Sequence, residues 1–245
     1  MKPILTLIGY CIILVSASSF AETPVAPGKK ATTFNVNTPS GFIENKGQFL
    51  DQNQKARTDL LYMFQGNGMK VQLMTNSISF ELYTMQEQPF SVDEAKGIPH
   101  YEQLDPEDRP TPKMLYKSSR VDVAFIGANP NPEVVAEEAM PDYLNYFLAY
   151  TPVKGITRVK EFNKITYKNL YNNIDLVMVA KRGQSPQQSF AYDFVVHPGG
   201  NVNDIKYRYD GDGQQLLFKN GNLQTVTQQG TITESIPESF VMNKE

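Results

Sequence analysis

The chain has 245 residues and a net charge of −3, from 23 basic and 26 acidic side chains. This balance excludes the strongly positive surface expected of a protein that binds nucleic acid or anionic lipid. One cysteine excludes a disulfide framework. The length suffices for one large or two small domains with a real core.

The first residues have the three parts of a secretory signal. Lys2 gives a positive start, Ile4 to Val15 form an apolar stretch, and Ser19 and Ala21 are small residues at the expected cleavage site. We predict a signal peptide over residues 1–21. Since no second apolar run of about 18 residues follows, no membrane span is expected after its removal. The predicted location is secreted or cell surface.

Cys11 lies inside this apolar stretch. A lipoprotein cleavage site needs a small residue before the cysteine, and Tyr10 stands there, so lipidation is not expected. The mature chain would then contain no cysteine, and an exported protein without disulfides must be stabilised by a buried core.

Residues 22–40 are rich in Pro, Thr and Ala without periodicity, which predicts a flexible leader. Residues 41–245 form the predicted domain. In residues 60–75, "GNG" separates two β-prone runs and indicates a hairpin. "GMKVQLM" and "SISFELY" then alternate apolar with polar residues, as strands with one buried face do.

Residues 85–117 break this pattern with several prolines and an acidic cluster, and they include His100. We predict an irregular insertion of about these bounds. Strand patterns resume at "RVDVAF" and continue in short runs separated by turns to "SFVMN". In "IKYRYDG", Tyr207 and Tyr209 are expected to face the core. The prediction is an all-β fold, an antiparallel β-sandwich of many short strands.

The stretch "AYDFVVHPGG" contains Asp193 and His197 on one face of a predicted strand. Their separation of four residues corresponds to about 13 Å along a strand. A hydrogen bond needs about 3 Å, so these two residues cannot form a catalytic pair. A different partner for His197 stays open.

Other catalytic arrangements find little support. The chain has two histidines, 97 residues apart, and no Gly-x-Ser-x-Gly elbow, so nucleophilic catalysis and a zinc site are not expected. We therefore predict a protein that is not an enzyme and has no cofactor.

Four carboxylates are the candidate site residues. Asp210 and Asp212 lie in a Gly-rich turn that resembles the start of a calcium loop but lacks the closing Glu, so an ordinary turn is favoured. Asp175 and Asp193 each interrupt an apolar strand, where a carboxylate needs a hydrogen bond or a cation. The favoured interpretation is a structural role, in which these polar side chains fix the register of the sheet and Lys181, Arg182 or backbone amides are their partners. Calcium, or a glycosidase-like carboxylate pair, is the alternative.

Six segments occur in the order seen in a known family: "GFIENKGQF", "VDVAFIGANPNPEVVAEE", "NYFLAYTPVK", "ITYKNLYNNIDLVMV", "YDFVVHPGGNVNDIKYRYDG" and "NGNLQTVT". Over residues 41–242 the chain resembles the uncharacterised N-terminal β-domain of exported bacterial proteins that carry β-propeller-type (SBBP) repeats or gliding-motility/type IX secretion sorting tails. The family commonly has Trp after "NYFLAY" and Pro-Gly at Asn172-Asn173, where this chain differs. The resemblance implies a secreted β-domain that continues beyond Glu245, and it supplies no catalytic residues.

The predicted function is a non-catalytic structural or adhesion domain whose partners are cell-surface proteins or glycans. Glycan binding, with or without calcium, is the alternative. A hydrolase using Asp175 and Asp193 is the third hypothesis.

Overall fold

The computed structural model describes residues 4–9, 41–66, 68–88, 97, 103, 113–181, 190–212, 215–235 and 238–242. Its strands are β1 (Ile4–Gly9), β2 (Phe42–Glu44), β3 (Leu60–Gly66), β4 (Met69–Met74), β5 (Ser77–Gln88), β6 (Lys113–Phe125), β7 (Glu133–Tyr146), β8 (Ile156–Tyr171), β9 (Ile174–Ala180), β10 (Phe190–Val196), β11 (Tyr207–Gly211), β12 (Gln215–Lys219), β13 (Asn222–Thr227), β14 (Gly230–Ser235) and β15 (Glu238–Met242). A short 3-10 helix, η2 (Val202–Asp204), precedes β11.

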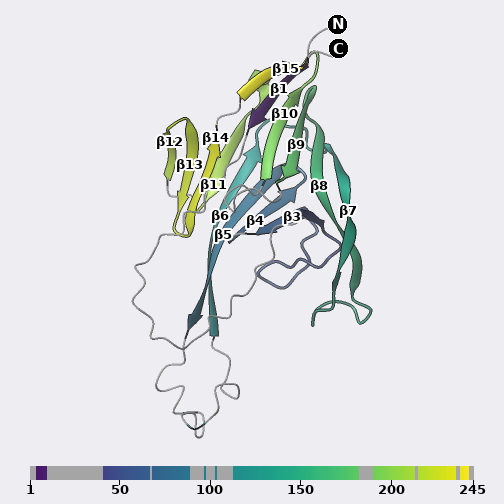
Figure 1. The fold of residues 1–245 in the computed structure, drawn as a ribbon, viewed down its shortest axis with the longest axis vertical. Helices are drawn as coiled ribbons and strands as arrows, with labels where there is room; N and C mark the ends of the chain where they lie inside the picture. The colour runs from purple at the N-terminus through teal and green to yellow at the C-terminus, as the bar shows by residue number, and fades with distance from the viewer. Residues whose placement is uncertain are drawn as a thin grey trace.

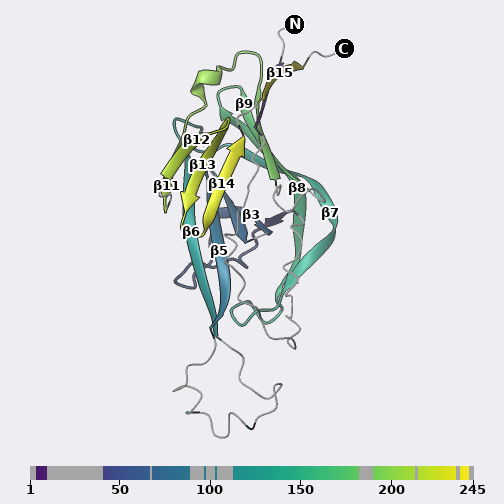
Figure 2. The ribbon, with the colours of Figure 1, turned by 60° about the vertical axis from the view of Figure 1, so that its left-hand side comes forward.

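Within the described residues, twelve strands form one sheet in the order β11-β6-β5-β4-β3-β2-β8-β9-β10-β1-β15, and β7 pairs with β8 beside this path. Strands β12, β13 and β14 form a second, smaller sheet. Neighbouring strands are antiparallel in both sheets. The large sheet curls, so that β4, β5 and β6 lie across the core from β8, β9 and β10 (Figures 1 and 2). The predicted all-β antiparallel fold is confirmed.

Short turns connect many of the strands. Gly66 pairs with Met69 across a two-residue loop, as the "GNG" signal indicated, and Gly68 has a φ of +73°. Asn220 and Gly221 both have positive φ, 52° and 74°, as a type I′ turn requires. Local turn chemistry therefore sets the register of these hairpins.

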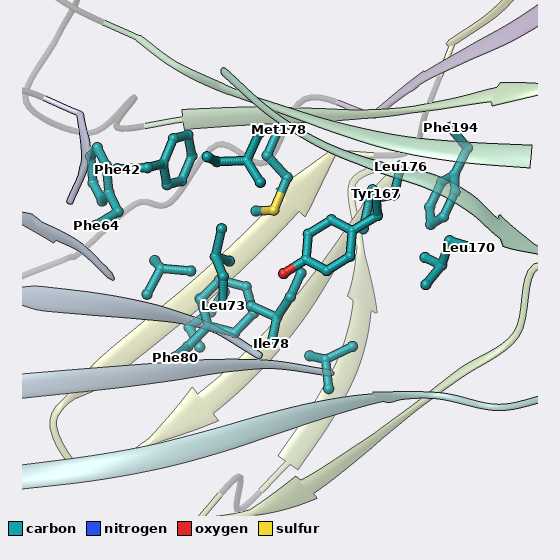
Figure 3. Packing of buried hydrophobic residues seen from close by; sticks show 14 of the residues in the cluster. Phe42, Phe64, Leu73, Ile78, Phe80, Tyr167, Leu170, Leu176, Met178 and Phe194 are labelled. Carbon is teal, nitrogen blue, oxygen red and sulfur yellow. The ribbon is translucent and has the colours of Figure 1, made fainter. Parts of the chain in front are cut away.

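The core lies between the two halves of the curled sheet (Figure 3). Alternating positions of β4 and β5, among them Val71 and Phe80, pack against Leu176 of β9 and Phe194 of β10. Tyr167 is fully buried and donates its hydroxyl to the backbone oxygen of Met74, 2.8 Å away. This bond meets the need of a buried polar atom for a partner and ties β8 to β4.

Strands β5 and β6 form a long two-stranded arm that extends beyond the body of the sheet (Figure 1). Their pairing runs from Ser77 opposite Ala124 to Gln88 opposite Lys113. Irregular structure was expected at about 85–117, and this prediction is wrong for residues 85–88 and 113–117, because they continue the ladder. Apart from residues 97 and 103, the rest of that segment, including His100, lies outside the described residues.

Strand β1 lies between β10 and β15, with Leu7 opposite Phe194 and Ser239. These residues belong to the predicted signal peptide, so the pairing describes the chain with residues 1–21 present. Cleavage after Ala21 stays a prediction. Among the described residues, we find no helix with the length and apolar character needed to cross a bilayer.

Candidate functional site

The outer face of β3–β6 carries a groove of about 740 Å³. This volume falls within the range of small-molecule sites, about 300–1,000 Å³. We call it the outer groove, and its lining residues are Gln48, Phe49, Leu50, Asp51, Gln52, Arg57, Leu60, Met63, Gln65, Lys70, Gln72, Glu81, Tyr116, Ser118, Arg120 and Tyr150. The floor positions alternate along their strands with core residues, so the sheet itself aims these side chains outward.

A chain of hydrogen bonds crosses the floor of the groove. Arg57 donates to the Gln72 oxygen (2.9 Å), and the Gln72 amide donates to Glu81 (3.2 Å). Lys70 lies 3.5 Å from Glu81 and donates to the hydroxyl of Tyr116 (2.9 Å). That hydroxyl in turn donates to Glu81. The network fixes the floor side chains in position before any ligand arrives.

Opposite charges lie next to one another around the groove. Arg57 forms a bidentate ion pair with Asp59, donating from Nε (2.8 Å) and Nη2 (2.7 Å) to the two carboxylate oxygens. Hydrogen bonding between the two raises the pKa of Arg57 and lowers that of Asp59. Arg120 pairs with Asp122 at 2.9 Å. Burial, and then the hydrogen bond to Glu81, raise the pKa of Tyr116, so this hydroxyl stays protonated.

The walls of the groove come from two loops. The loop after β2 packs Phe49 over the small apolar cluster of Leu60, Met63 and Met74. Tyr150, from the loop after β7, donates its hydroxyl to the backbone oxygen of Gln48 at 3.0 Å. Segments about 100 residues apart thus meet at this wall.

Asp175 and His197 form the pair that the sequence left open. The Oδ2 atom of Asp175 lies 2.8 Å from Nε2 of His197, and its Oδ1 accepts the backbone N–H of Asn169 at 2.7 Å. Val195 is the register partner of Asp175, which places His197 diagonally across the β9–β10 hairpin. Asn169 lies in an irregularity of β8 between Tyr167 and Tyr171, so Asp175 satisfies an amide that the ladder does not. A backbone amide as partner was among the predicted possibilities.

Asp193 lies on the same outer face, opposite Val177. Its Oδ1 atom is buried and accepts no hydrogen bond. Burial raises the pKa of Asp193 to about 6, against the opposing effect of the positive charge of Lys181. Asp175 and Asp193 are on adjacent strands as the hairpin prediction required, but only Asp175 is held by hydrogen bonds from its neighbours.

Asp210 and Asp212 occupy the end of β11. Asp210 pairs with Arg208 at 2.8 Å, and the Oδ2 atom of Asp212 accepts the backbone N–H of Arg120 at 2.9 Å. Asp210 lies within strand β11, opposite Asp122, and Asp212 follows the end of that strand. Among the described residues, no three His, Cys, Asp or Glu side chains gather closely enough to hold a metal ion.

A much smaller hollow lies where the two sheets meet. It has about 20 Å³ of free space, room for about one water molecule, between apolar residues of both halves. Glu234 of β14 is 5% exposed and accepts hydrogen bonds from Tyr192 (3.0 Å) on β10 and from Tyr209 on β11. Burial raises the pKa of Glu234. We call this trio the carboxyl clasp. The expected core position is confirmed for Tyr209, whereas Tyr207 is 38% exposed.

Sequence reasoning missed both the outer groove and the carboxyl clasp. The alternation in "GMKVQLM" and "SISFELY" does place Lys70, Gln72 and Glu81 on the wet face. It cannot show that Tyr116, which is 35 residues beyond Glu81 in the chain, completes their network. Glu234 gives no local signal, because "TITES" has the polar alternation of an ordinary exposed strand.

Comparison with known proteins adds a family. A search of curated proteins and a search of solved structures found no match. A family model described as "Domain of unknown function (DUF7948)" matches residues 42–245, nearly the range over which the six motifs show their resemblance. Since this match covers most of the chain, the chain belongs to the DUF7948 family of domains of unknown function.

Proposed function

We propose that this chain is a non-catalytic, exported β-domain that works in adhesion at the cell surface. On this proposal it is a module of larger secreted proteins linked to gliding or type IX secretion. The signal-like residues 1–21 support export. The resemblance of the six motifs supports the link to such proteins.

The observation that carries the adhesion role is the outer groove. It is wide, it lies on the outer face of the sheet, and its floor is held by paired charges and hydrogen bonds. Pre-organised polar surfaces of this kind suit binding, because little ordering is needed when a partner arrives.

The two outer-face carboxylates support a structural role for the β9–β10 hairpin. Both oxygens of Asp175 are engaged, one by His197 and one by the Asn169 amide. Asp193 is half buried opposite Val177. A carboxylate pair for hydrolysis would instead need both groups open to substrate and water.

Glycan recognition is the second candidate function. The groove combines tyrosines, amide side chains and carboxylates, which together offer hydrogen-bond donors and acceptors beside aromatic rings. In this candidate function, any calcium ion that assists binding would take its ligands from Asp175, Asp193, Asp210 and Asp212.

Export is tested by producing the full chain in a Gram-negative host and measuring the mass of the protein in each cell fraction. We expect a form that begins at Glu22 outside the cytoplasm. A matched chain with Ile13→Arg in the apolar stretch should stay in the cytoplasm unprocessed. Equal distribution of the two chains would refute export.

Adhesion is tested with the exported chain on intact bacterial cells and isolated cell walls. We expect saturable binding that Ser118→Trp weakens, because Ser118 is an exposed residue that lines the groove. Thr157→Trp, an equal addition at an exposed position of β8, is the control. Absence of saturable binding to every surface would overturn the adhesion role.

A further inference from the structure

We infer that the outer groove binds an uncharged oligosaccharide. This inference rests on the proposed recognition role of the domain and gives it a ligand class. Three features of the groove carry it: the balance of its charges, the mixture of donors and acceptors, and the exposed rings of Tyr116 and Tyr150 in its lining.

The charges of the groove compensate one another. Arg57 is paired with Asp59, Lys70 with Glu81, and Arg120 with Asp122. The carboxylate of Asp51 remains, and it accepts the backbone amides of Asn53 and Lys55 in its own loop, each at 2.8 Å. An anionic or cationic ligand would have to compete with these pairs. A neutral ligand would not, and it would gain from dipoles already oriented.

Donors and acceptors are interleaved along the floor. Gln72 is 5% exposed and uses both ends of its amide, so it holds Arg57 and Glu81 at a fixed spacing. Exposed Gln65 and Ser118 add an amide and a hydroxyl to the lining. A sugar ring carries several hydroxyls, each both donor and acceptor, and such a ligand matches a mixed polar floor.

Tyr116 provides an aromatic surface with a fixed orientation. Its hydroxyl is engaged by Lys70 and Glu81, and its ring stacks on Tyr83 with centroids 5.4 Å apart and an interplanar angle of 25°. Its side chain is still 42% exposed, and Tyr150 at the opposite wall is 50% exposed. The apolar C–H face of a sugar packs on such rings, and a rigid ring loses little entropy on binding.

The position of the groove argues against a peptide strand as the ligand. Strands β4 and β5 in the floor are paired on both sides, β4 with β3 and β5, and β5 with β4 and β6. Their backbone groups are thus used within the sheet, and strand addition needs an open edge. Recognition here must use side chains, which favours a ligand rich in hydroxyls.

The test is calorimetric titration of the exported form of the protein, which is expected to begin at Glu22, with defined hexasaccharides. Cellohexaose, maltohexaose, laminarihexaose and mannohexaose are the uncharged probes, and the hexamers of guluronate and glucosamine are the charged ones. Tyr116→Ala removes the ring, while Ser118→Trp fills the groove from an exposed position. Tyr143→Ala, at a tyrosine of β7 that is 56% exposed, and Thr157→Trp are the matched controls.

We expect at least one uncharged probe to bind, with a Kd that changes less than about twofold between about 50 and about 500 mM NaCl. Tyr116→Ala and Ser118→Trp should each weaken binding about tenfold or more, and the two controls should not. Thermal melting of each variant separates loss of binding from loss of folding, and Ser118→Trp keeps the test valid if Tyr116→Ala unfolds.

Binding of charged probes alone, equal binding by the groove variants, or no binding of any probe would overturn the inference. Surface adhesion that persists while every hexasaccharide fails would refute the glycan ligand and leave the adhesion role standing. Binding of an uncharged probe by a chain that is never exported would support the groove assignment and refute the exported function.

Discussion

Asp175 and Asp193 show how two carboxylates in similar strand sequences acquire different energetic roles. Asp175 receives two hydrogen bonds, one from a backbone amide that the β8 irregularity leaves unpaired. Asp193 has a buried oxygen that accepts none. At this scale, stability depends on whether a half-buried charge is satisfied, since an unsatisfied one costs free energy.

Removing the satisfied carboxylate should be costly. We expect Asp175→Ala to lower the free energy of unfolding by about 2 kcal/mol, because it leaves the Asn169 amide and the imidazole of His197 without their acceptor. Asp193→Ala is the matched control, and it should cost less than about 1 kcal/mol or stabilise. Urea unfolding of the two variants at neutral pH measures the difference, and equal losses would contradict the assigned roles.

Asp193 should also make stability depend on pH. Its folded pKa of about 6 exceeds the ordinary value of 3.8, so the folded state holds a proton that the unfolded state releases. Stability from this group is therefore lost as pH rises from about 4 to about 6 and stays constant above. The full shift corresponds to about 3 kcal/mol, and solvent access to this half-buried group reduces it to about 1 kcal/mol.

The measurement compares the native chain with Asp193→Asn by urea unfolding across this pH range. As pH rises from about 4 to about 6, the free energy of unfolding of the variant should increase by about 1 kcal/mol relative to that of the native chain. A difference that does not vary with pH would show that Asp193 titrates normally.

Strands β1 and β15 show what a single element contributes to the sheet. Strand β1 pairs on one side with β10 and on the other with β15, so it links β15 to the large sheet. The same residues are expected to leave with the signal peptide. The described pairing and the predicted processing therefore give this end of the sheet two different forms.

Hydrogen exchange should distinguish these forms. In a chain that begins at Glu22, the backbone amides of β15 lose their β1 partner and should exchange faster than in the full chain. The β3–β6 meander is far along the sheet and should keep its protection in both chains. Unchanged protection of residues 238–242 would mean that β15 finds another partner.

At the scale of the whole molecule, the carboxyl clasp joins the two sheets. Tyr192 and Tyr209 come from β10 and β11, on opposite halves of the curled sheet, and Glu234 from the small sheet bonds to both. The pair of tyrosines and the carboxyl therefore hold three parts of the fold together. Burial favours the neutral form of the Glu234 carboxyl, and this effect outweighs the two tyrosine hydrogen bonds, which favour the charged form.

This clasp should weaken as pH rises. Because burial raises the folded pKa of Glu234, stability from this group is greatest below its unfolded pKa, about 4.3, and declines as pH rises through the folded pKa. In thermal melting, the Tm of the Glu234→Gln variant should rise relative to that of the native chain as pH increases. Glu133→Gln, at a carboxyl that is 70% exposed, is the control and should show no such trend. A parallel trend in both variants would refute the clasp.

The sequence alone determined the all-β class, most hairpins and the outward positions of Lys70, Gln72 and Glu81, because alternation and turn residues are local properties of the chain. It also excluded a hydrogen-bonded pair of His197 and Asp193, since strand geometry sets the distance between them. The partner of His197, the length of the β5–β6 arm, the outer groove and the carboxyl clasp were decided by tertiary structure. Each joins residues far apart in the chain, and only the curl and register of the folded sheet determine which of them meet.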